Sequence, residues 1–204
     1  MSLLLQKEVE KVKRKVLSLS TFVEENLQRA VKSVEDRDAK LARKAIEADI
    51  PIDHMEIDVE EEILKILALH QPVAVDLRFL VAVLKINSDL ERIGDLAVNI
   101  AERSLNLTSQ SSLTLKFSEM SGRVQTMVTN ALNALVNIDS KLARDVLEKD
   151  NAVDAINRAA YDKVREAIEK SPTDTDACIH QLSVSRYLER IADHATNIAE
   201  DVIY

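Results

Sequence analysis

Four acidic pairs in this sequence have the residue types and the spacing of metal ligands. In each pair three residues separate two carboxylates, and the pairs are Asp49 and Asp53, Glu91 and Asp95, Asp150 and Asp154, and Glu189 and Asp193. Carboxylates four residues apart lie one turn apart on the same face of a helix. Carboxylate oxygens bind hard and borderline cations, and pairs on two neighbouring helices can surround an ion. The spacing therefore predicts cation sites, and four pairs can hold more than one ion.

The alternative for any single pair is an exposed acidic face that is merely solvated by water. Acidic side chains four residues apart repel each other by a few tenths of a kcal/mol. This penalty recurs at four equivalent places, while neighbouring positions differ, as at Gly94 and Ala192 or Lys44 and Asp145. The recurrence favours metal ligands over a solvated face.

The acidic pairs recur because the chain contains an internal duplication. Residues 90–102 match residues 188–200 at 10 of 13 positions, and residues 38–53 match residues 139–154 at 8 of 16. Between these blocks the offset falls from 101 to 98 residues, so the second half is three residues shorter. Each pair in the first half thus has an equivalent pair in the second half.

The composition predicts that helices position these pairs. The 204 residues include only 2 glycines and 3 prolines, and aromatic residues make up 3% of the chain, which excludes a protein rich in β-sheet. Apolar residues recur at spacings of three and four, which predicts six amphipathic helices of roughly 25 to 35 residues. Turns are expected near residues 35–38, 70–72, 106–112, 138–140 and 171–173.

We therefore predict an all-α fold of two tandem three-helix bundles related by internal duplication. Three helices can close a small bundle by burying one apolar stripe each. The predicted units are a first repeat at residues 1–105, a linker rich in hydroxyl and amide side chains at 106–112, and a second repeat at 113–204.

The third helix of the first repeat indicates where the acids lie relative to the core. Its core-facing seam, with steps of three and four residues, consists of Val83, Ile86, Leu90, Ile93, Ala97 and Ile100. A polar stripe lies off this seam, within about 80° of helix surface, and consists of Glu91, Asp95, Asn99 and Glu102. The equivalent stripe in the second repeat includes Asn197. The predicted cation sites are therefore on the surface of the bundles.

The remaining residues give no support for other chemistry. The formal net charge of −8 at pH 7 opposes binding to nucleic acid. Cys178 is the only cysteine, so neither an intrachain disulfide nor a thiolate metal site can form. No nucleophile with a paired base and no glycine-rich phosphate loop is visible, and the four histidines share no repeat-equivalent positions. Because no catalytic groups are visible, we expect a protein that is not an enzyme. The first residues lack the apolar region of a signal peptide, so we expect it to be cytoplasmic.

Two segments of the chain resemble the signature helices of the PhoU family of phosphate-transport regulators. They are QPVAVDLRFLVAVLKINSDLERIGDLAVNIAE at residues 71–102 and YLERIADHATNIAE at residues 187–200, and the resemblance spans essentially the full length. It implies two pseudo-symmetric three-helix bundles with multinuclear clusters of divalent or trivalent metal ions, such as iron or zinc, on their surface. The implied ligands are the eight carboxylates of the four acidic pairs, with Asn99 and Asn197 as accessory ligands.

The resemblance also implies a regulatory role. Such a protein is a negative regulator of phosphate uptake and of the phosphate-starvation response. It connects the ATPase subunit of the phosphate ABC transporter to a sensor histidine kinase, and it reaches the membrane only through these partners. We also expect a homodimer.

Two other classes of protein compete with this interpretation. One is a metal-free helical scaffold that binds partners through its amphipathic faces, since suitable spacing does not itself show an ion. The other is a ferritin-like di-metal protein, which places Glu and Glu-x-x-His ligands inside its bundle. The sequence contains no Glu-x-x-His, and its acidic pairs lie off the core seam.

Overall fold

Helices form almost all of the part of the chain that the structure describes, which is residues 3–107 and 113–203 of a computed structural model. The first bundle consists of α1 (Leu3–Glu35), α2 (Ala39–Glu47), α3 (Asp49–His70) and α4 (Ala74–Asn106). The second consists of α5 (Ser118–Asn137), α6 (Ser140–Lys170), the short 3₁₀-helix η1 (Pro172–Asp174) and α7 (Thr175–Ile203). These residues contain no β-strand, which confirms the all-α prediction. Most of the predicted linker, residues 108–112, lies outside the described residues.

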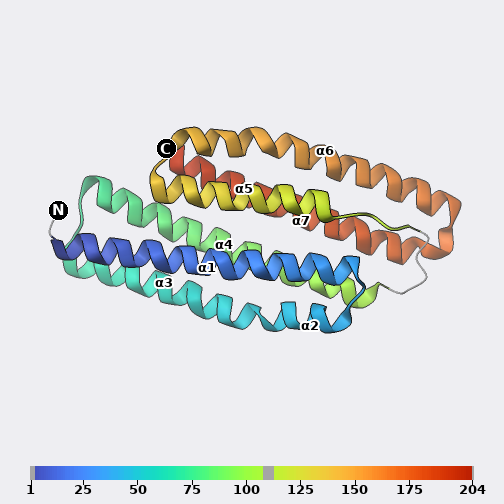
Figure 1. The fold of residues 1–204 in the computed structure, drawn as a ribbon, viewed down its shortest axis with the longest axis horizontal. Helices are drawn as coiled ribbons and strands as arrows, with labels where there is room; N and C mark the ends of the chain where they lie inside the picture. Colours follow the sequence, from blue (N-terminus) through green and yellow to red (C-terminus); the bar gives the residue numbers. More distant parts are fainter. Residues whose placement is uncertain (1–2, 108–112, 204) are drawn as a thin grey trace.

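The two bundles lie side by side, and their helices run roughly along the longest dimension of the molecule (Figure 1). α4 packs against α7 and α1 packs against α5. Lys85 Nζ lies 2.9 Å from Asp201 Oδ1, and further along α4 Asp89 Oδ1 lies 2.8 Å from His194 Nδ1, so α4 and α7 run antiparallel. All six residues of the predicted seam on α4 are buried in a hydrophobic core that extends across both bundles.

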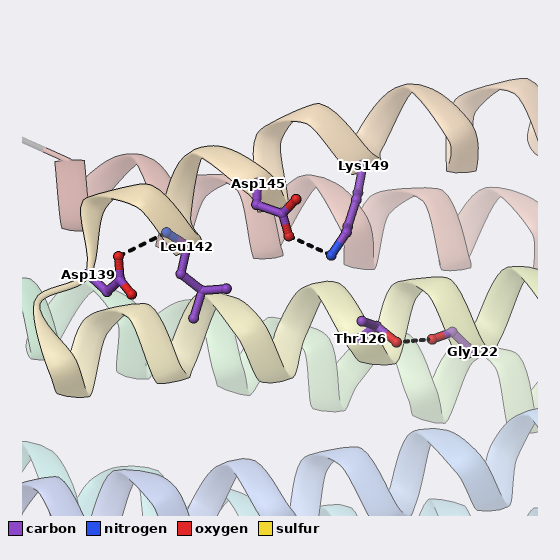
Figure 2. Close-up of polar contacts among 6 residues, drawn as sticks. All are labelled: Gly122, Thr126, Asp139, Leu142, Asp145 and Lys149. Atoms are coloured by element: carbon purple, nitrogen blue, oxygen red, sulfur yellow. Dashed lines mark hydrogen bonds and ion pairs between the residues drawn. The ribbon is translucent and has the colours of Figure 1, made fainter.

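The second helical segment of each repeat begins at the same kind of N-cap. The Asp38 carboxylate accepts hydrogen bonds from the backbone N–H groups of Lys40 and Leu41, at 2.8 and 3.1 Å. Asp139 occupies the equivalent position before α6, and Figure 2 shows its carboxylate bonded to the backbone N–H of Leu142 at 3.0 Å. These caps satisfy backbone donors that have no partner within the helix.

Removal of the second cap is expected to destabilise the protein. Asp139→Ala should lower the free energy of unfolding by about 1 kcal/mol, because two backbone N–H groups lose their acceptor. The matched control is Asp145→Ala on the same helix, whose carboxylate makes only an exposed ion pair with Lys149 at 2.6 Å (Figure 2). This control should change the free energy by less than about 0.5 kcal/mol. Urea unfolding measures both values, and equal losses would contradict the assignment of the cap.

The prediction of six helices is wrong in the first repeat, where the second segment is broken at Ala48. Pro51 lacks the N–H that would bond to the carbonyl of Glu47, and its ring clashes with that carbonyl in a continuous helix. The segment therefore ends as α2 and begins again as α3, with Pro51 in the first turn, where proline is tolerated. The equivalent residue in the second repeat is Ala152, and α6 is continuous through it.

None of the helices in the described residues is long and apolar enough to cross a membrane.

Candidate functional site

The first acidic cluster, defined as Asp49, Asp53, Glu91 and Asp95, lies where the start of α3 packs against α4. The pKa of Asp49 is raised to about 6, first by burial and then by the charges of Asp53 and Asp95. Burial also raises the pKa of Glu91, and the charges of Asp95 and Asp53 raise it further. Two carboxylates from each helix therefore share one electrostatic site, as the spacing predicted.

The second acidic cluster is defined as Asp150, Asp154, Glu189 and Asp193, and it lies between α6 and α7. The pKa of Asp150 is raised by burial and then by the charges of Asp154 and Asp193. Burial likewise raises the pKa of Glu189 and of Asp193, and Asp154 raises both further. Both clusters lie at half-buried or exposed positions on the outside of the bundles, so the predicted surface location is confirmed.

One carboxylate oxygen of the second acidic cluster lacks a polar partner within the described part of the chain. Asp150 Oδ1 is buried and has no hydrogen-bond partner among the described residues. A buried carboxylate oxygen without a partner costs free energy, because it has lost its water and gained nothing in exchange. A bound cation would supply that missing interaction.

The clusters are not preformed metal sites. The described residues contain no group of three or more His, Cys, Asp or Glu side chains that is already arranged to hold an ion. Carboxylates that repel one another have no reason to converge while no cation is between them. Coordination would therefore require side-chain rotations within each cluster.

The two asparagines predicted as accessory ligands lie at the edges of the clusters. Asn99 follows Asp95 by one turn on α4 and is half-buried, and Asn197 follows Asp193 by one turn on α7 and is exposed. No interaction within the described residues links either amide to a cluster carboxylate. Their role as ligands stays a prediction.

Glu56 is a fifth carboxylate at the first cluster that the sequence prediction missed. Burial raises its pKa, as do the charges of Glu60 and Asp53, and its own charge raises the pKa of Glu91. Asn87 on α4 donates a hydrogen bond to Glu56 Oε1 at 3.0 Å. Glu56 follows Asp53 by three residues and so lies on the same face of α3, which was the available signal.

At the positions equivalent to Glu56 and Asn87, the second repeat has two uncharged residues. Asn157 is equivalent to Glu56, and Ser185 is equivalent to Asn87. The Ser185 hydroxyl donates a hydrogen bond to Asn157 Oδ1 at 2.8 Å. The contact between the helices is thus kept while the carboxylate is lost, and the two clusters differ in charge.

His194, to which the sequence assigned no role, bridges the two bundles. Its Nδ1 lies 2.8 Å from Asp89 Oδ1, and both side chains are largely buried between α7 and α4. The contact joins one repeat to the other, so comparing equivalent positions could not reveal it. His194 follows Asp193 of the second acidic cluster directly in the sequence.

These observations define a class of protein: a duplicated all-α fold with a carboxylate cluster on the surface of each repeat. The model of the PhoU domain family matches the chain twice, at residues 16–104 and 117–202. The chain therefore belongs to the PhoU family.

Known relatives share both its sequence and its fold. The chain is 33% identical over 202 residues to the phosphate-specific transport system accessory protein PhoU homolog 1 of Thermotoga maritima, covering 98% of this chain and 87% of that protein. It is 36% identical over 200 residues to the PhoU homolog of Pseudomonas aeruginosa, covering 97% and 83% of the two chains.

Solved structures extend this similarity to the fold. The crystal structure of PhoU from Pseudomonas aeruginosa matches with a TM-score of 0.92 at 36% identity, over 98% of this chain and 97% of that one. The phosphate transport system regulatory protein PhoU from Streptococcus pneumoniae matches with a TM-score of 0.92 at 25% identity, over 98% and 95%. The predicted fold of two tandem three-helix bundles is confirmed.

Proposed function

We propose that this chain is an accessory protein of phosphate-specific transport and represses phosphate uptake when phosphate is plentiful. The observation that carries the proposal is family membership across both repeats, together with relatives that are named accessory proteins of that system. The protein would act by contact rather than by catalysis, since no set of nucleophile and base was found in the sequence.

Its proposed partners are the ATPase subunit of the phosphate ABC transporter and a sensor histidine kinase. The two similar bundles lie side by side (Figure 1), so each has an outer face of its own, an arrangement that suits an adaptor with two partners. We place it in the cytoplasm, where such an ATPase and the kinase domain lie, and expect it to form a homodimer. No nucleic acid is expected among its partners, because the formal net charge is −8.

The two acidic clusters are proposed to hold divalent or trivalent metal ions such as iron or zinc. Their donors are carboxylate oxygens, which suit such cations, and the unpartnered Asp150 Oδ1 fits a missing ligand interaction. The ligands would be the eight cluster carboxylates, with Asn99 and Asn197 as accessory donors. Bound ions would offset repulsion between neighbouring helices and so fix the surface that partners contact.

A metal-free scaffold is the second candidate, and one observation favours it. No group of three or more potential ligands in the described residues is arranged around an ion position. Metal analysis of the purified protein distinguishes the two candidates. The ferritin-like alternative does not fit, because it needs ligands inside the bundle and both clusters lie outside the core.

Deletion of the encoding gene is expected to derepress phosphate-uptake genes in medium rich in phosphate. Loss of a repressor adaptor leaves the starvation response active although phosphate is present. Transcript levels of the uptake genes provide the measurement, and expression of the intact chain from a plasmid should restore repression. Unchanged transcript levels in the deletion strain would count against the regulatory proposal.

A further inference from the structure

A surface pocket of about 540 Å³ lies between α6 and α7 beside the second acidic cluster. Three arginines line it, Arg158 from α6 and Arg186 and Arg190 from α7. The volume falls in the range of about 300–1,000 Å³ that is typical of sites for small molecules. Guanidinium groups from two helices therefore face one space of suitable size.

These guanidinium groups make few direct contacts with other groups among the described residues. Arg186 and Arg190 make no ion pair or hydrogen bond among the described residues. Arg158 makes only a long contact of 3.5 Å between its Nη1 and Asp154 Oδ2, and its side chain is 70% exposed. The planar guanidinium group presents several donors in a fixed fork, which matches the oxygens of a phosphate group.

Neutralisation of the neighbouring acids does not explain the three arginines. At the positions equivalent to Arg158 and Arg186, the first repeat has Ile57 and Ser88, so only Arg190 has a counterpart, Arg92. Yet the first cluster carries the additional carboxylate of Glu56, and so has the greater need for positive charge. Arginines that served only as counter-charges would gather at the first cluster.

The remaining walls of the pocket suit the organic part of a ligand. Tyr161, with 59% of its surface exposed, and Leu182 line the same pocket. An exposed ring and an aliphatic side chain offer a face on which a flat group can stack. Two acids, Glu189 and Asp193, also line the pocket, and the charges of Arg186 and Arg190 oppose the rise in their pKa values.

We propose that the pocket between α6 and α7 binds a small phosphate-bearing anion, held by Arg158, Arg186 and Arg190. The anion is either inorganic phosphate or the phosphate group of a small organic molecule whose remaining part lies on Tyr161. The site belongs to the second repeat alone. It borders the second acidic cluster, because Glu189 and Asp193 line the same pocket.

Isothermal titration of the full chain with inorganic phosphate and with AMP tests this proposal. Both probes carry one phosphate group, and at least one is expected to bind saturably at one site per chain. Equal affinities assign the site to free phosphate. Tighter binding of AMP assigns it to a phosphorylated organic molecule, and Tyr161→Ala should then reduce the affinity for AMP to that for phosphate.

Two variants, one in each repeat, separate a specific anion site from general electrostatic attraction to the protein. Arg186→Gln is expected to weaken binding about tenfold or more, because a charge-assisted hydrogen bond is lost. Arg92→Gln removes the same charge from the first repeat and should leave affinity unchanged. The proposal is overturned if neither probe binds saturably, or if both variants weaken binding equally.

Discussion

Removal of the proposed metal ions with a chelator is expected to lower the melting temperature of the protein by about 10 °C. A ligand that binds only the folded state stabilises it by about 4 kcal/mol at a thousandfold excess over its Kd. For a chain of this length, each kcal/mol corresponds to roughly 2–4 °C. The unfolded chain cannot gather carboxylates from two helices, so an ion bound at the proposed sites would stabilise only the folded state.

Variants that replace one proposed ligand should also reveal whether stability depends on metal. Asp95→Asn and Asp193→Asn each keep the shape of the side chain, but each replaces a charged ligand, so each should lower the bound metal per chain. Glu102→Gln is the matched control, because Glu102 lies on the same polar stripe of α4 as Asp95 but outside the first acidic cluster. Elemental analysis and thermal unfolding with and without EDTA provide the readouts. If EDTA leaves the melting temperature unchanged and neither variant loses metal, the metal-free scaffold is the better interpretation.

The duplicated fold and the location of the clusters could be predicted from sequence because both follow from local periodicity. A helix fixes which residues share a face, so the seam of α4 and its polar stripe are determined by spacing alone. The N-cap residues Asp38 and Asp139 are also local signals, since a side chain bonds to backbone two and three residues away. Duplication then indicated which of these signals recur.

The break at Ala48 could not be predicted from the same periodicity. Apolar spacing continues on both sides of it, and the available signal was instead Pro51, which disrupts a continuous helix. The break places Asp49 in the first turn of α3, where the helix dipole favours a negative charge. The equivalent Asp150 lies inside the continuous helix α6 and lacks that contribution.

Contacts between helices account for the other features that the sequence did not reveal. The bridge from His194 to Asp89 and the grouping of arginines in the pocket between α6 and α7 depend on how two helices are aligned. That alignment is set by packing of the whole core rather than by local spacing. Comparing the repeats cannot reveal a contact that joins them.

Asp49→Asn is expected to have opposite effects on stability in the absence and in the presence of metal. In the metal-free protein the pKa of Asp49 is raised to about 6 from 3.8, chiefly by burial and then by Asp53 and Asp95. The folded state therefore binds this proton more tightly than the unfolded state does, and ionisation of Asp49 destabilises the folded state. This cost is absent below about pH 4 and is complete above about pH 6.

At pH 7 and with EDTA, Asp49→Asn should thus raise the free energy of unfolding by about 1 kcal/mol, a value discounted for solvent screening of a half-buried group. At pH 4 the variant and the wild type should be equally stable. With metal present the sign reverses, because the variant lacks a ligand and gains less from bound ions. Asp145→Asn, an exposed acid outside both clusters, should change stability by less than about 0.5 kcal/mol under every condition. Urea unfolding at the two pH values, with and without metal, measures all of these differences. A variant that is less stable than the wild type at pH 7 in EDTA would contradict the raised pKa of Asp49 and the destabilising effect of its ionised form.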